Sequence, residues 1–159
     1  IFMLTYYLGG INLRDLMEYN FKNQNSMRYV RHKTRNSKKS ENEIAFTIQP
    51  EAQVIIDNYI SDNGKLVFGR YSSYEKAYSL VFRHIYKVAN LAGVNRKVSY
   101  YSARKTFAQH GYNMGIEIEK IEYCIGHSMK NNRPIFNYIR IMQEHADKVF
   151  RAIFDQLIK

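Results

Sequence analysis

The alternation of apolar and polar positions divides the chain into short segments, most of which have the three-to-four-residue spacing of amphipathic helices. Residues 1–7 are largely apolar and end at the glycine pair 9–10, which indicates a break. Leu13 and Leu16 then recur at helical spacing, and Asn12 stands at the expected N-cap. Segments with the same spacing follow at residues 50–61, 74–93, 102–115, 116–126 and 133–159.

The ends of these predicted helices carry recognisable signals. Asp15 stands three residues after Asn12, where a capping box more often has Glu or Gln. Pro50 fits the first turn of the helix at 50–61, and Gly93 fits the C′ position after the helix at 74–93. The apolar stripe expected on the helix at 50–61 consists of Val54, Ile55 and Tyr59.

Two runs with strand character interrupt the helical pattern. Residues 26–34 and 42–48 flank a polar tip at 35–41, which predicts a β-hairpin with a long basic loop. The residues at 66–69 read as a short buried segment after a turn. We therefore expect a mainly α domain with a small antiparallel β-hairpin or sheet near the N-terminus, an α+β fold.

Charge is the first property that bears on function. Lys and Arg number 24 against 14 Asp and Glu, which gives a formal net charge of +10 and a pI near 9.6. Residues 28–39 hold six Lys or Arg and one His without an acid, so the hairpin predicts contact with phosphates. The candidate DNA-binding residues are Arg31, Lys33, Arg35, Lys38, Lys39, Lys105 and Arg133.

Other function classes find little support in the sequence. One Cys and five scattered His give no metal-ligand spacing, and neither a P-loop nor a GxGxxG motif is present. We therefore expect no metal and no nucleotide cofactor. The chain has no apolar run of about 18 residues, so we expect no membrane span. The single Cys124 excludes an internal disulfide and makes a cytoplasmic location the default expectation.

Three features considered together point to a family. Residues 101–108 read YSARKTFA, with Arg104 at their centre; residues 125–127 read IGH; and Lys33 stands in the basic hairpin. This order and spacing resemble the C-terminal catalytic domain of the tyrosine recombinase (phage integrase) family, as found in integrases of bacterial mobile elements. The family pattern is roughly H-x-x-R-H-T-F-A, then L-G-H, then a tyrosine. Residues 6–21 also resemble the family's first conserved box.

The resemblance implies a specific chemistry. A tyrosine hydroxyl would attack a phosphodiester of double-stranded DNA, forming a 3′-phosphotyrosyl link and releasing a 5′-hydroxyl without metal, ATP or other cofactor. Arg104 matches the family's second arginine, which binds the phosphate. His127 matches its histidine, a hydrogen-bond donor to the phosphate, and Lys33 matches the hairpin lysine, the general acid for the leaving 5′-oxygen.

The chain departs from the family pattern at several positions. Asn12 stands where the first arginine is expected, and Arg14 lies two residues on, turned by about 200° on a helix. Either Asn12 contributes a neutral hydrogen bond, or Arg14 or another basic residue supplies the charge. Tyr101 replaces the family's first histidine, and its hydroxyl can still donate a hydrogen bond to a phosphate oxygen. Lys105 replaces a frequent histidine beside the arginine and also keeps a donor.

The nucleophile position is the most consequential departure. In the family the tyrosine falls nine residues after the histidine, and this count from His127 ends on Phe136, whereas Tyr138 lies at eleven. One interpretation is a longer loop or shifted helix that brings Tyr138 into the site. The other is that Phe136 occupies the nucleophile position and leaves a domain that binds DNA without cleaving it.

The resemblance also sets expectations about organisation and partners. Residues 1–159 read as one catalytic domain, a fragment without the N-terminal DNA-binding domain usual in the family. The amphipathic C-terminal helix is expected either to pack within the chain or to join protomers of a synaptic tetramer on DNA. The rival functions are a degenerate DNA-binding module and an unrelated helical domain that binds RNA or a membrane surface.

Overall fold

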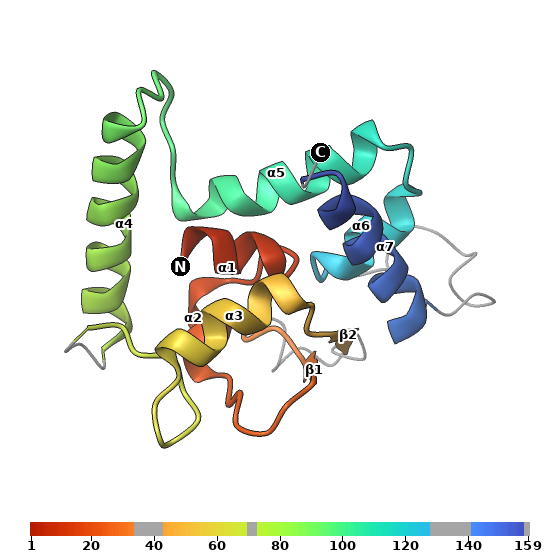
Figure 1. Cartoon of the computed structure of the whole chain (residues 1–159), viewed down its shortest axis with the longest axis horizontal. Helices are drawn as coiled ribbons and strands as arrows, with labels where there is room; N and C mark the ends of the chain where they lie inside the picture. The colour runs from red at the N-terminus through yellow and green to blue at the C-terminus, as the bar shows by residue number, and fades with distance from the viewer. Residues whose placement is uncertain (34–42, 70–72, 128–140, 158–159) are drawn as a thin grey trace.

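The computed structural model describes residues 1–33, 43–69, 73–127 and 141–157 of the 159-residue chain. Within these ranges the chain is mainly helical with a two-stranded antiparallel sheet (Figure 1), which confirms the expected fold class. The elements are α1 (Phe2–Tyr7), α2 (Leu13–Glu18), β1 (Ser26–Tyr29), β2 (Ile44–Thr47), α3 (Pro50–Tyr59), α4 (Tyr74–Leu91), α5 (Tyr100–Asn113), α6 (Ile118–Cys124) and α7 (Gln143–Asp155).

The core forms where α1, α5, α7 and β2 meet. Phe46 of β2 stacks on Phe150 of α7 with ring centroids 4.6 Å apart, and Phe150 also contacts Phe107 of α5. These three rings and Phe154 are fully buried. Burying one such side chain contributes about 2–3 kcal/mol of transfer free energy, so this cluster holds the C-terminal helix to the first half of the chain.

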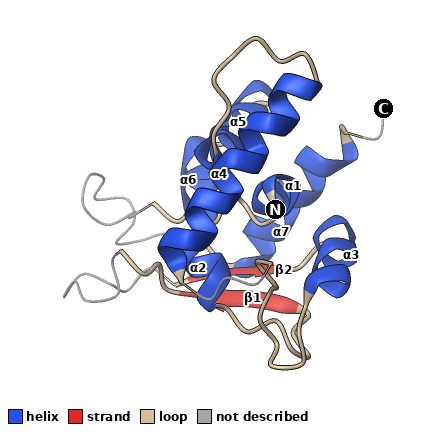
Figure 2. Ribbon diagram, turned by 90° about the vertical axis from the view of Figure 1, so that its left-hand side faces the viewer, coloured by secondary structure: helices blue, strands red, loops and turns tan. Residues whose placement is uncertain are grey.

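The hairpin predicted around the basic loop is present. Strands β1 and β2 pair antiparallel from Ser26 opposite Thr47 to Tyr29 opposite Ile44. Figure 2 shows the two strands side by side at one end of the molecule, with α3 following directly from β2. The basic tip of the hairpin, residues 34–42, lies outside the described residues.

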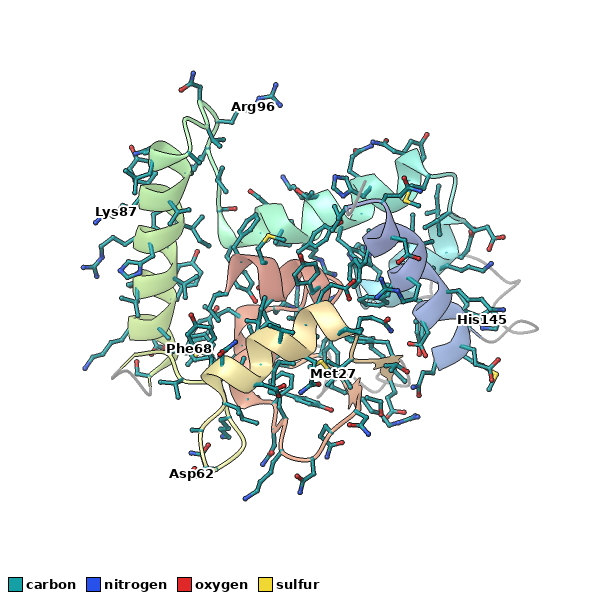
Figure 3. The ribbon with its side chains drawn as sticks, in the orientation of Figure 1. Met27, Asp62, Phe68, Lys87, Arg96 and His145 are labelled. Carbon is teal, nitrogen blue, oxygen red and sulfur yellow. The ribbon has the colours of Figure 1, made fainter. Side chains whose placement is uncertain are left out.

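Helix α4 lies at one edge of the fold (Figure 1). Only a narrow stripe of the helix is buried, consisting of Ala77, Val81, Ile85 and Ala89. Lys87 on this helix and Arg96 in the connector after it point away from the body (Figure 3). The helix ends as predicted at Gly93, whose φ of 68° places it in the left-handed region, with the Val94 N–H bound to the Ala89 carbonyl at 3.0 Å.

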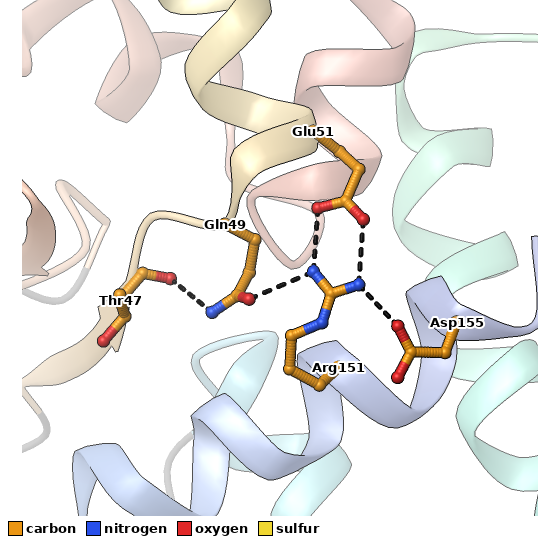
Figure 4. A network of polar contacts seen from close by, with 5 residues as sticks. All are labelled: Thr47, Gln49, Glu51, Arg151 and Asp155. Atoms are coloured by element: carbon orange, nitrogen blue, oxygen red, sulfur yellow. Dashed lines mark hydrogen bonds and ion pairs between the residues drawn. The ribbon is translucent and has the colours of Figure 1, made fainter.

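Helix α7 is joined to α3 and to the end of β2 by a polar network (Figure 4). Arg151 donates two hydrogen bonds to the carboxylate of Glu51, both at 2.9 Å, and one to Asp155 at 2.7 Å. It also binds the Gln49 amide oxygen at 3.2 Å, and Gln49 in turn donates to the Thr47 carbonyl. The bidentate geometry fixes the direction of the helix as well as its position.

Two sequence-based expectations about the helices are wrong. Of the stripe expected on α3, Ile55 is partly buried against the core, but Val54 and Tyr59 are exposed, and Ala52 and Ile56 are the fully buried residues. The helix packs through positions 52 and 56, one turn apart. Val54 lies two residues from each of them, so it points to the opposite side.

The predicted continuous helix at 133–159 is also wrong at its centre. Residues 141 and 142 are not helical, and α7 begins at Gln143. The physical cause is a new helix start, because His145 Nδ1 accepts the backbone N–H of Met142 at 3.1 Å while Met142 has extended φ and ψ. The spacing of a continuous helix over 133–159 would place Ile135, Ile139, Met142 and Ala146 on one inward stripe. Ala146 is buried but Met142 is 58% exposed, and Ile135 and Ile139 lie outside the described residues.

A membrane-spanning helix is not found among the described residues, because none of their helices combines the necessary length and apolar character.

Candidate functional site

Arg104 is a buried cation held between two turns of the backbone. It lies on α5 and is only 4% exposed. One terminal nitrogen donates to the Gly10 carbonyl at 2.9 Å, and the other donates to the Ile125 carbonyl. Burial is the main cause that lowers its pKa, and the nearby charge of Arg31 lowers it further. The guanidinium is therefore fixed in one orientation before any ligand arrives.

Gly10 makes this arrangement possible. Its φ is 75°, in the region that favours glycine, and an added Cβ would lie 2.5 Å from the Cγ of Arg104. The turn between α1 and α2 therefore needs a glycine both for its backbone conformation and for the close approach of the arginine. In the Gly9–Gly10 pair, which the sequence indicated as a break, Gly10 lies against Arg104 and Gly9 lies against the Cys124 carbonyl and Phe150.

His127 follows a regular helix end on α6. The Gly126 N–H binds the Tyr123 carbonyl and the His127 N–H binds the Glu122 carbonyl, both at 2.8 Å, which is a Schellman motif. The His127 ring is half-exposed, with Nδ1 3.9 Å from Glu122. Burial first, and then the charges of Arg104 and Arg31, lower the pKa of His127. His127 is therefore a neighbour of both guanidinium groups.

Arg31 brings a second guanidinium to the same place. Its Nη1 donates to the Gly126 carbonyl at 2.8 Å, one residue before His127. It also acts electrostatically on both Arg104 and His127. From the sequence Arg31 was placed only among the candidate DNA-binding residues. Its position two residues before Lys33 in the hairpin was the available signal for a closer role.

Asn12 and Arg14 have different environments from those of a phosphate-binding pair. Asn12 flanks α2, but its side chain makes no cap bond and instead donates to Asp15 Oδ2 at 3.3 Å. Arg14 is exposed, lies 3.5 Å from Glu18 and covers the ring of Tyr74 at 5.0 Å. It is thus directed toward α4, as the predicted rotation of about 200° requires.

Asp15 is a buried carboxylate that sequence reasoning considered only as a capping residue. It is 5% exposed, and its Oδ1 accepts the backbone N–H of His32 at 2.6 Å. His32 lies between Arg31 and Lys33. The carboxylate therefore holds residues 30–33, the segment after β1 that carries both cations and is called the arm below. The position of an acid in the first turn of a helix gave no sign of this long-range contact.

The remaining candidate residues divide into three groups. Lys33 is exposed at the end of the described arm. Tyr101 is half-exposed and close enough to Arg104 to affect the pKa of that arginine. Lys105 Nζ lies 5.8 Å from the centroid of the Tyr101 ring. Arg35, Lys38, Lys39, Arg133, Phe136 and Tyr138 lie outside the described residues. In the described part of the chain, no group of three or more His, Cys, Asp or Glu could hold a metal ion.

The structure therefore brings Arg104, His127 and Arg31 together, with Tyr101 beside them. The contributing elements are α5, the end of α6 and the arm after β1. Together these residues offer several N–H donors and net positive charge at one place. Such an arrangement suits a phosphate group with charge on its non-bridging oxygens.

Comparisons with known proteins agree with this chemistry. The model of the phage integrase family matches residues 2–145. A curated protein described as "Tyrosine recombinase" from Pseudothermotoga lettingae is 28% identical over 102 residues, which cover 62% of this chain and 35% of that protein. The chain thus spans about a third of the length of this relative. A search of solved structures finds no match.

The family match extends from α1 into the first turn of α7, and so contains Arg31, Arg104 and His127. By this match over most of its length, the chain belongs to the phage integrase family of tyrosine recombinases.

Proposed function

We propose that residues 1–159 form the catalytic domain of a site-specific DNA recombinase or integrase. The domain breaks and rejoins strands of double-stranded DNA through a 3′-phosphotyrosyl intermediate. The observation that carries the proposal is the buried guanidinium of Arg104, held by the Gly10 and Ile125 carbonyls beside Arg31 and His127. Family membership and the surplus of basic residues support DNA as the substrate.

The reaction needs stabilisation of charge on phosphorus. Attack by a tyrosine oxygen places extra negative charge on the non-bridging oxygens of the phosphate in the transition state. Preorganised N–H donors in a partly buried site stabilise that charge, and removal of one donor typically costs about 2.7–4 kcal/mol. Arg104 has donors beyond those used by the two carbonyls, and the His127 ring contributes another.

We assign the role of the missing first arginine to Arg31. The side chain of Asn12 is engaged by Asp15, and Arg14 is directed toward Tyr74. Arg31, by contrast, reaches the helix end that carries His127 and acts electrostatically on Arg104. Support for this assignment is therefore positional, since a guanidinium from the hairpin arm occupies the neighbourhood of the other two phosphate-binding groups.

Lys33 is the proposed general acid. The tyrosine hydroxyl loses its proton to solvent as its oxygen bonds to phosphorus. The bond from phosphorus to the 5′-oxygen breaks, and Lys33 gives its proton to that oxygen. In the rejoining step the 5′-hydroxyl returns its proton to Lys33 and attacks phosphorus, and the released tyrosine oxygen takes a proton from solvent. The anchoring of its neighbour His32 by Asp15 supports a defined position for this arm.

The nucleophile is proposed to be Tyr138, with Phe136 as the alternative position. Both residues belong to the segment between α6 and α7 that lies outside the described residues. Tyr138 is the hydroxyl-bearing ring of the two, which favours it as the attacking group. If Phe136 occupies the nucleophile position, the domain is a degenerate DNA-binding module, the second candidate function.

Self-association into a synaptic tetramer on DNA belongs to the same proposal. Phe150 and Phe154 of α7 are fully buried within the chain, so this face of the helix packs in cis. A contact between protomers through α7 therefore uses its exposed end near Leu157, or requires exchange of the helix. A cytoplasmic location follows as an expectation for a DNA-acting protein.

A suicide substrate tests the proposal. A DNA duplex nicked beside the scissile phosphate loses its short 5′-hydroxyl fragment after cleavage and traps the covalent adduct. The protein and a Phe136→Tyr variant are compared, with Arg104→Ala as the inactive control. An adduct supports the enzyme; its absence in both the wild-type protein and the Phe136→Tyr variant contradicts the enzyme and favours the binding module. An adduct in the variant alone identifies position 136 as the nucleophile site.

A further inference from the structure

The outer edge of strand β2 is closed by side chains from two helices. On its inner edge β2 pairs with β1, so the N–H groups of Ala45 and Thr47 point to the other side. Ala45 donates to the Tyr123 hydroxyl of α6 at 3.0 Å, and Thr47 donates to Asp147 of α7 at 2.6 Å. The strand that forms one side of the hairpin is thus bonded directly to α6, the helix that His127 follows.

Tyr123 has two functions at this helix end. Its backbone carbonyl accepts the Gly126 N–H in the Schellman motif, and its hydroxyl accepts the β2 N–H. Gly126 packs closely on the same strand, because a Cβ there would collide with the side chain of Ile44. The turn that presents His127 is therefore in contact with β2 through both the hydroxyl and the glycine.

The turn has two further contacts, both from arginine side chains. Arg31 reaches Gly126 from the arm after β1, and Arg104 reaches Ile125 from α5. These two contacts are made by cations that also face the phosphate in the proposed function. The Tyr123 hydroxyl is placed differently, since it bonds to the β2 backbone at Ala45 and is not itself a cation that would bind the phosphate.

We propose that Tyr123 is a positioning residue for the reaction. By holding β2 against the end of α6, its hydroxyl sets the distance between His127 and the hairpin cations Lys33 and Arg31. This inference rests on the proposed function, because the distance matters only if these groups act on one phosphate. A shift of about 1 Å between catalytic groups can cost about 100-fold in rate, so a modest displacement of the hairpin is enough.

The test compares Tyr123→Phe with a matched control, Tyr6→Phe. Both changes remove one hydroxyl and keep the ring. The Tyr6 hydroxyl lies 2.8 Å from His110, in a contact between α1 and α5 away from the site. Covalent-adduct formation on the suicide substrate is measured in single turnover, in whichever of the wild-type or Phe136→Tyr backgrounds forms an adduct. The melting temperature and the DNA dissociation constant are measured alongside.

We expect Tyr123→Phe to slow adduct formation about 10-fold. Its DNA dissociation constant should change no more than that of Tyr6→Phe. Its melting temperature should fall, because the Ala45 N–H loses its acceptor, so adduct rates are compared at a temperature at which both variants are fully folded. A substrate with sulfur in place of the bridging 5′-oxygen should restore most of the rate, because a thiolate leaves without a proton from Lys33. Equal adduct rates for the two variants, or no recovery with the sulfur substrate, would overturn this inference and leave the proposed function standing. Failure of both backgrounds to form any adduct would overturn the proposed function and this inference with it.

Discussion

The buried carboxylate of Asp15 accepts the backbone N–H of His32 at 2.6 Å, and this bond ties helix α2 to the arm of the hairpin. His32 is flanked by Arg31 and Lys33, so the bond fixes the two cations that the proposed reaction takes from the hairpin. The Asn12 side chain supports the same carboxylate through its second oxygen. Asn12, which stands where the family pattern has an arginine, thus helps to orient the Asp15 carboxylate.

Replacement of Asp15 by alanine should destabilise the fold. The His32 N–H would lose its bond to the buried Asp15 carboxylate, and a hydrogen bond to a charged group typically contributes about 1.5–3 kcal/mol. Urea unfolding measures this free energy, and adduct formation on the suicide substrate should fall as well because the arm is released. Asp57→Ala on the exposed side of α3 is the control, with an expected change within about 0.5 kcal/mol. Equal stability of the two variants would contradict the anchoring role.

Replacement of Arg31 by alanine tests the substitute for the missing first arginine. We expect adduct formation to fall by about 10²–10³-fold, the typical cost of one transition-state donor. The DNA dissociation constant should rise far less, since one phosphate contact among several is lost. Arg14→Ala is the matched control, because Arg14 contacts Glu18 and Tyr74 instead. A larger loss of activity in Arg14→Ala than in Arg31→Ala would refute the assignment.

Alanine substitutions at Gly10 and Gly115 separate the cost of a strained backbone conformation from the cost of a steric clash. Both have positive φ, 75° and 73°, but an added Cβ at Gly115 meets open space whereas one at Gly10 meets Arg104. Gly115→Ala should therefore cost about 1–2 kcal/mol of unfolding free energy. Gly10→Ala should cost clearly more and should also impair DNA cleavage. Similar costs for the two variants would show that the close approach of Arg104 is unimportant.

The lowered pKa of His127 predicts a direction for the pH dependence of stability. Burial and the charges of Arg104 and Arg31 favour the neutral ring in the folded state. The unfolded chain then binds more protons than the folded chain below the ordinary His pKa of about 6.5, so stability decreases as the pH falls through that region. Thermal unfolding of the protein and of His127→Gln between pH 5 and 8 measures this. The variant should lose part of the slope, and an unchanged slope would contradict the prediction.

The sequence was sufficient to predict the fold class and the residues with strong local signals. The hairpin, the start of α3 at Pro50 and the end of α4 at Gly93 follow from short-range patterns, and all three are present. The stripe on α3 was wrong at Val54 and Tyr59, because the face that meets the core is centred on Ala52 and Ile56, with Ile55 at its border. The start of α7 was missed because a single bond from Met142 to His145 decides it.

The site was predictable where it depends on motif and unpredictable where it depends on long-range contacts. Arg104 and His127 stand in recognisable sequence patterns, and the structure places them together. The contacts of Arg31 with Gly126, Asp15 with His32 and Tyr123 with Ala45 join residues 17 to 95 positions apart. A hydrogen bond across such a separation leaves no periodic trace in the sequence. The sequence therefore named Arg31 as a DNA-binding residue and Asp15 as a capping residue, and these contacts were found only in the fold.

The most direct test of DNA strand cleavage by this domain is the mass of the protein–DNA adduct. The protein and its Phe136→Tyr variant are trapped on the suicide substrate and digested, and the modified peptide is sequenced by mass spectrometry. The account predicts an adduct on Tyr138 in the wild-type protein, or on position 136 in the variant, and none when Arg104 is alanine. Absence of an adduct in both proteins, or an adduct on a residue outside 128–140, would contradict it.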